Sequence, residues 1–198
     1  MSFFDNRVRL GTAIWAIGIL QCVSGLTQIL WGIADVLPVS EGIPTGIAHI
    51  LSGIIYIALG NGIRLGVFKT KWDILLKILL MTAVNTALDV TFGIREGLVD
   101  TVATDIMDLA LAGIMVLVYR KLKKEQPDRI TRVLFYITCI VYVCMLISDM
   151  VSITDSPVDS LRGICGLIVD IYVILALKDP AIREKFGIVS KKTVENAA

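Results

Sequence analysis

Six apolar segments, each at least 20 residues long, constrain this chain more than any other feature of its sequence. An α-helix needs about 20 mainly apolar residues to cross the hydrocarbon core of a bilayer. The six segments are Leu10–Val36, Pro44–Ile63, Ile74–Ile94, Leu98–Tyr119, Ile130–Ile153 and Val158–Leu177. The sequence therefore predicts an all-α, polytopic membrane protein whose six transmembrane helices form three helical hairpins.

The composition excludes several other classes of protein. The chain is 56% hydrophobic and only 19% charged, whereas soluble domains carry about 25% charged residues. A net charge of +1 provides no overall field to attract nucleic acid. The four cysteines form no C-x-x-C pair, which argues against a disulfide scaffold or a zinc ribbon. We expect a bilayer as the main partner, no nucleic acid and no cofactor.

The positive charges predict the orientation of the six segments. If the connections alternate between the two sides, all 19 lysine and arginine residues except Arg95 and Arg162 lie on the side of the two termini. Lysine and arginine are enriched in cytoplasmic loops. We therefore expect a multi-pass protein of the cell membrane with both termini in the cytoplasm.

The hairpins suggest an internal repeat. The predicted bundle covers residues 1–178, with possible repeats at 8–69, 72–125 and 129–178, and residues 179–198 form a short cytoplasmic tail. Gln28, Asp89 and Asp149 fall late in the first helix of each hairpin, at spacings of 61 and 60 residues. Such repeats occur in many transporters. Three unrelated hairpins of equal length would also place polar residues in this way, so both interpretations stay open.

Five aspartates lie inside the predicted spans and more than two residues from either end, where each costs roughly 2.5–3.5 kcal/mol to insert. They are Asp89, Asp105, Asp108, Asp149 and Asp170. The topology places the first four in the outer half of the membrane and Asp170 near its middle. Helix capping by Asp105 or Asp108 is an alternative interpretation.

Other polar residues follow the same distribution. Gln28, His49, Ser52, Asn85 and Arg162 also fall in the outer half, and the polar residues of each span share a helical face. Lipid does not solvate such faces, so we expect them to turn toward one another around an acidic cavity that opens outward. These five residues and the five aspartates form the predicted binding site, with no metal specified and no catalytic residue.

This pattern favours a solute-binding or transport-related protein over an enzyme. An excess of carboxylates must be protonated, hydrated or neutralised by a cation, which predicts a proton or a small cationic solute as ligand. In size, helix number and outward pocket, the chain is similar to the substrate-binding components of energy-coupling vitamin importers, which implies a partner subunit. A non-catalytic assembly subunit with a purely structural polar core is a further alternative.

Overall fold

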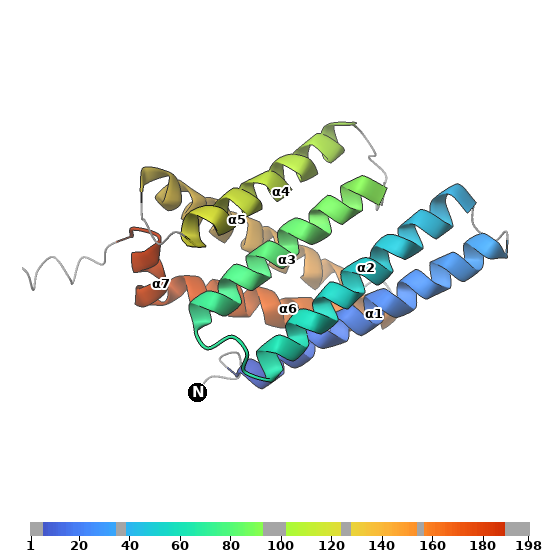
Figure 1. Cartoon of the computed structure of the whole chain (residues 1–198), viewed down its shortest axis with the longest axis horizontal. Helices are drawn as coiled ribbons and strands as arrows, with labels where there is room; N and C mark the ends of the chain where they lie inside the picture. Colours follow the sequence, from blue (N-terminus) through green and yellow to red (C-terminus); the bar gives the residue numbers. More distant parts are fainter. Residues whose placement is uncertain (1–5, 35–38, 93–101, 124–127, 154–156, 189–198) are drawn as a thin grey trace, which may run out of the picture.

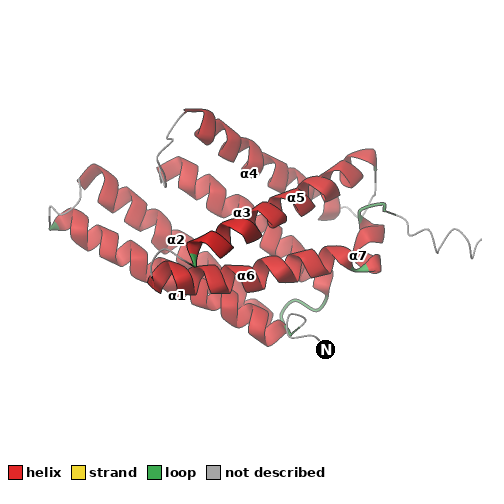
Figure 2. Ribbon diagram, turned by 180° about the vertical axis from the view of Figure 1, so that it is seen from behind, coloured by secondary structure: helices red, strands yellow, loops and turns green. Residues whose placement is uncertain are grey.

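The computed structural model describes residues 6–34, 39–92, 102–123, 128–153 and 157–188 (Figures 1 and 2). Within these residues the chain forms seven α-helices and no strand, which confirms the all-α prediction. The helices are α1 (Arg7–Ile33), α2 (Val39–Arg64), α3 (Lys71–Phe92), α4 (Val102–Lys123), α5 (Arg129–Ser152), α6 (Pro157–Lys178) and α7 (Pro180–Lys185).

Three of the helices are long and apolar enough to cross a membrane: Arg7–Ile33, Gly42–Arg64 and Arg129–Val151. Many of their large apolar side chains are exposed at the surface of the bundle, such as Leu30 and Ile140, each 63% exposed. A soluble monomer rarely exposes so much apolar surface. The structure thus indicates association with a membrane, while six crossings and their orientation stay predictions.

Local sequence signals explain where several helices begin. The side chain of Asn6 accepts a hydrogen bond of 2.9 Å from the amide of Val8 and so caps α1. Asp128 and Thr131 form a reciprocal capping box at the start of α5. Between α2 and α3, Gly66 adopts a φ of 71° that favours glycine and allows the chain to turn.

The helices α1 and α2 pack against each other more closely than any other pair, along a line of glycines. We call this line the glycine seam: Gly11, Gly18, Gly25 and Gly32 of α1 with Gly42, Gly46, Gly53 and Gly60 of α2. A Cβ added to Gly18 would lie 2.6 Å from the carbonyl oxygen of Gly53, and a Cβ on Gly53 would lie 2.6 Å from that of Gly18. The two backbones are therefore in direct contact, which only residues without a side chain permit.

The short helix α7 closes one end of the bundle (Figure 1). Phe186, just beyond it, is fully buried, with its ring edge-on to Trp72 of α3 and Phe135 of α5 at centroid distances of 5.7 and 5.2 Å. The buried aromatic contacts anchor this segment. Residues 179–188, which the sequence analysis assigned to a tail, thus pack on the bundle, and residues 189–198 lie outside the described part.

Candidate functional site

The structure describes the side chains of six of the ten predicted site residues: Gln28, His49, Ser52, Asn85, Asp149 and Asp170. The other four are Asp89, Asp105, Asp108 and Arg162, which lie on helices but whose side chains fall outside the described part. The predicted contributions of α4 to a site therefore stay predictions. The six described residues occur on α1, α2, α3, α5 and α6.

Two of the predicted residues link α1 to α2. The Nδ1 atom of His49 lies 2.8 Å from Oε1 of Gln28, and His49 is 6% exposed. An amide oxygen only accepts hydrogen bonds, so this arrangement requires a proton on Nδ1 of the imidazole. The pair satisfies two polar groups that would otherwise be costly in an apolar bundle.

A second pair links α2 to α3. The hydroxyl of Ser52 donates a hydrogen bond of 2.9 Å to Oδ1 of Asn85, and Ser52 is buried. Ser52 follows His49 by three residues, so the two side chains lie on the same face of α2. The sequence analysis grouped these residues, and the structure places them in two neighbouring interhelical hydrogen bonds.

A third pair, Thr82 of α3 and Tyr142 of α5, was not among the predicted site residues. Their hydroxyl oxygens lie 3.0 Å apart, and Tyr142 is fully buried. Thr82 donates its only hydroxyl proton to the carbonyl of Ile78 at 3.1 Å. Tyr142 must therefore donate to Thr82. Thr82 precedes Asn85 by three residues and Tyr142 precedes Asp149 by seven, so extending the predicted polar faces inward would have found both.

The fourth pair consists of the carboxyl groups of Asp149 and Asp170, which lie in hydrogen-bonding contact between α5 and α6. Asp170 is only 2% exposed. Its Oδ2 atom accepts no hydrogen bond from any donor in the described residues. Two carboxylates can form a hydrogen bond only when one of them holds a proton. This pair therefore needs a shared proton, or a cation in its place.

Glycine makes room for this pair. Gly166 precedes Asp170 by one helical turn, and a Cβ on Gly166 would overlap the carboxyl group of Asp149. Backbone packing at Gly163 brings α5 equally close, since a Cβ there would lie 2.7 Å from the carbonyl oxygen of Asp149. The site on α6 is thus shaped by two small residues and one buried acid.

These four pairs form what we call the polar layer: Gln28, His49, Ser52, Thr82, Asn85, Tyr142, Asp149 and Asp170. Tyr142 connects its members further, because Asp170 and Tyr56 both lie close enough to act electrostatically on its hydroxyl. Another buried oxygen, Oε1 of Gln21 on α1, has no hydrogen-bond partner in the described residues. The members of the predicted polar faces whose side chains the structure describes thus meet in pairs.

Two cavities of the described structure lie near the end of the bundle that α7 closes. One, of about 270 Å³, is bounded by α5, α6 and α7. The other, of about 380 Å³, lies beside Phe68, Lys69, Lys77 and Tyr119. On α5, Asp149 is 14 residues beyond Phe135 of the first cavity, or about 21 Å along the axis. Neither is the predicted acidic cavity, which stays a prediction. No cluster of three metal-ligating side chains occurs in the residues searched, which are the described ones.

The electrostatics at the α7 end involve exposed groups. Lys121 of α4 donates a hydrogen bond of 2.7 Å to Oδ2 of Asp128. This bond, together with those from Thr131, holds the pKa of the Asp128 carboxyl well below its usual range. The hydrogen bonds stabilise the ionised form of this aspartate, whereas the carboxyl groups of Asp149 and Asp170 in the polar layer face each other.

Comparisons of the chain with protein-family models, with curated proteins and with solved structures find no match. The site must therefore be interpreted from its own geometry.

Proposed function

We propose that this chain is a multi-pass protein of the cell membrane that binds a proton or a small cation in its polar layer, in a transport-related role. In this proposal α1 to α6 all cross the bilayer and both termini lie in the cytoplasm. The observation that carries the binding proposal is the carboxyl pair of Asp149 and Asp170.

Helix lengths and packing support the proposed topology. The helices α3, α4 and α6 have 22 residues each, which gives about 33 Å at 1.5 Å per residue, against a hydrocarbon core of about 30 Å. The most extensive packing joins consecutive helices, α1 with α2, α3 with α4 and α5 with α6. This pattern is what three hairpins would produce.

The chemistry of the carboxyl pair supports a proton or cation as ligand. Two ionised carboxylates in contact repel each other, and burial penalises both charges. One proton removes half of the charge and supplies the hydrogen bond. A cation that coordinates both groups would neutralise the pair equally well. The neighbouring Tyr142 and Thr82 continue the path of polar groups from α6 to α3.

The proposal is tested by the thermal stability of the full chain in lipid nanodiscs, measured from about pH 6 to about pH 9. We expect the melting temperature to fall as the pH rises, because loss of the shared proton leaves two charges in a buried site. At high pH a bound cation should restore it, and a ligand at 100 times its dissociation constant stabilises by about 2.7 kcal/mol. Sodium, calcium and the polyamine spermidine are the probes.

Matched variants show whether these responses come from the carboxyl pair. Asp170→Asn should abolish both the pH response and the cation effect, since an amide neither ionises nor shares a proton in the same way. Glu184→Gln, at an exposed position on α7, should leave both unchanged. If the parent and Asp170→Asn respond identically to pH and to the cations, the polar layer is a structural core, and the assembly-subunit alternative replaces this proposal.

A further inference from the structure

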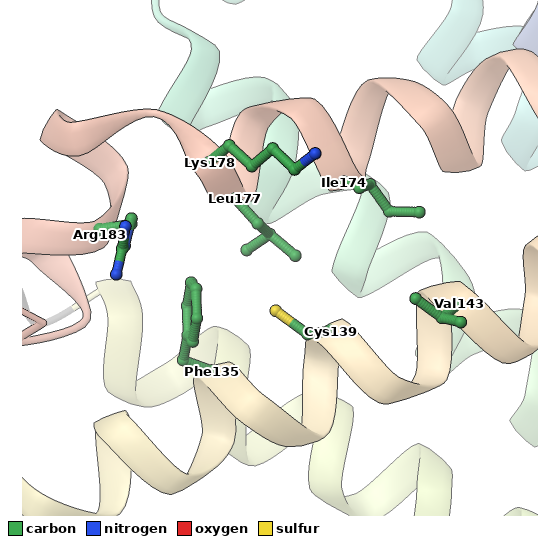
Figure 3. Close-up of a pocket in the computed structure, with 7 residues that line it drawn as sticks. All are labelled: Phe135, Cys139, Val143, Ile174, Leu177, Lys178 and Arg183. Atoms are coloured by element: carbon green, nitrogen blue, oxygen red, sulfur yellow. The ribbon is translucent and has the colours of Figure 1, made fainter.

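The cavity of about 270 Å³ between α5, α6 and α7 combines two kinds of surface (Figure 3). Its wall is apolar and consists of Phe135, Cys139 and Val143 on α5 with Ile174 and Leu177 on α6. Lys178 and Arg183, which are both exposed, complete the lining with the apolar parts of their side chains and carry their charges at its rim. We call this cavity the α5–α7 groove.

The two cations approach the groove from different helices. In Figure 3, Lys178 extends from the end of α6 on one side, Arg183 stands on α7 next to Phe135, and Cys139 points into the space between α5 and α6. The guanidinium of Arg183 also lies within electrostatic reach of the Cys139 thiol. The charged end of Lys178 reaches toward Ile174 and that of Arg183 lies beside Phe135, so positive charge flanks an otherwise apolar groove on two sides (Figure 3).

The fold holds these cations in place. The helix α6 ends at Lys178, and Asp179 caps α7 with Pro180 in its first turn, so the chain changes direction between the two cations. The buried Phe186 then fixes α7 against α3 and α5. Arg183 is consequently positioned by a docked helix rather than by a free tail.

The cations have no internal counter-charge in the described residues. No carboxylate there lies within ion-pair distance of Lys178 or Arg183, and the nearby Asp179 instead faces Lys71 at 3.9 Å. An anion from outside the chain would neutralise the two charges. A free inorganic anion would leave the apolar wall uncovered, whereas an amphiphile would satisfy both surfaces.

We propose that the α5–α7 groove binds one anionic phospholipid, with its phosphate at Lys178 and Arg183 and an acyl chain along the apolar wall. Along α5 the wall runs from Phe135 to Val143, or about 12 Å. Arginine binds phosphate through paired N–H groups, and basic pockets between transmembrane helices on the cytoplasmic side bind anionic headgroups. This inference rests on the proposed membrane crossing, because it needs the groove to open into the cytoplasmic leaflet.

The test is native mass spectrometry of the full chain, released from nanodiscs that contain equal amounts of phosphatidylglycerol and phosphatidylcholine. We expect the parent protein to retain phosphatidylglycerol preferentially. The double variant Lys178→Gln/Arg183→Gln should reduce that preference on the order of tenfold, since each cation near a membrane surface contributes measurably to binding anionic lipid. The control Arg120→Gln/Arg132→Gln loses the same charge at exposed positions and should keep the preference.

Two further arms separate the possible outcomes. Cys139→Phe fills the apolar wall but leaves both cations, so it should also reduce lipid retention; retention unchanged by it, or competition by millimolar inorganic phosphate, would identify a phosphate site instead. Equal loss in both double variants would overturn the groove as the site. A chain that enters nanodiscs but shows no lipid preference refutes this inference alone, whereas a chain that does not insert refutes the proposed membrane topology as well. Asp170→Asn should retain lipid like the parent.

Discussion

The interfaces α1–α2 and α5–α6 both depend on glycine, but they use the missing side chain differently. In the glycine seam, the space at Gly18 is occupied by the backbone of α2 at Gly53 and Ile57. At the α5–α6 interface, the space at Gly166 is occupied by the carboxyl group of Asp149. Gly18 therefore faces mainly main-chain atoms, and Gly166 faces an ionisable side chain, although Gly163 on the same helix as Gly166 also faces the backbone of Asp149.

This difference separates a structural contact from a responsive one. Backbone atoms in a helix cannot move without moving the helix, so the seam resists any added volume. A carboxyl group can change rotamer, lose a proton or bind a cation, and it lies next to the buried Asp170. We expect α1 and α2 to behave as one rigid unit, and the α5–α6 interface to respond to pH and ligands.

The largest expected effect is that of Gly18→Ala. The added methyl group would lie 2.6 Å from the carbonyl oxygen of Gly53 and 2.8 Å from the amide nitrogen of Ile57. Relief requires α1 and α2 to separate along the seam, and overpacking of this kind costs about 1–3 kcal/mol, occasionally more. Thermal unfolding in detergent, followed by circular dichroism, should show a clear fall in the melting temperature.

Gly113→Ala is the matched control for this prediction. Gly113 also lies within a helix, α4, but no atom of another helix in the described part of the chain lies within 4 Å of the position its Cβ would take. Alanine favours a helix over glycine by about 1 kcal/mol, so this variant should be as stable as the parent or more stable. Equal destabilisation by the two substitutions would show that close backbone packing is not what holds α1 against α2.

A somewhat smaller effect is expected from Gly166→Ala, because the group that must move is a side chain. Displacing the Asp149 carboxyl from its position next to Asp170 should cost about 1–2 kcal/mol. Asp149→Ala removes the obstructing group, so Gly166→Ala should cost little in that background. These substitutions form a double-mutant cycle, in which contacting residues show coupling energies of 0.5–3 kcal/mol. The free energies of unfolding of the parent, the two single variants and the double variant measure the coupling.

The corresponding cycle in the seam sharpens the comparison. Ile57→Ala removes the side-chain atom nearest to the added methyl at Gly18, but the backbone atoms of Gly53 and Ile57 remain. Gly18→Ala should therefore stay destabilising in the Ile57→Ala background. Rescue in both cycles, or in neither, would mean that the two interfaces do not differ in the way the structure indicates.

The sequence predicts the helices well because their signal is local. Each of the six long apolar segments overlaps one of α1 to α6 in the described residues, since burial in lipid or in a bundle requires continuous apolar residues. The faces that carry His49 with Ser52, and Asp149, were also predictable from helical spacing. The partners were not, because the pairing of Ser52 with Asn85 depends on how two helices lie against each other.

The seam and α7 show what such reasoning misses. The spacing of seven residues from Gly11 to Gly32 was visible, but only packing shows that it faces a similar series on α2. Pro180 and the mixed charges after Lys178 suggested a tail, whereas Ile182 of α7 and Phe186 just beyond it are buried against the bundle. Short amphipathic segments acquire their structure from tertiary contacts rather than from length.

The smallest effect is expected at the other end of α5, where Asp128 provides an acid of the opposite kind to Asp149. Its pKa is held well below the usual range, chiefly by the hydrogen bond from Lys121, so folding favours its ionised form. That contribution is complete above the unfolded pKa of about 3.9 and is lost as the pH falls toward the lower folded value. Asp128→Asn should therefore be less stable than the parent at about pH 6, by a modest margin that shrinks toward about pH 3. Unfolding midpoints at both values measure this, and a margin that stays constant would show that the capping geometry matters rather than the charge. This pH dependence of stability is opposite in sign to that proposed for the pair of Asp149 and Asp170, whose contribution to stability should fall as the pH rises. The helix α5 would then carry two acids whose stabilising contributions are lost at opposite ends of the pH range.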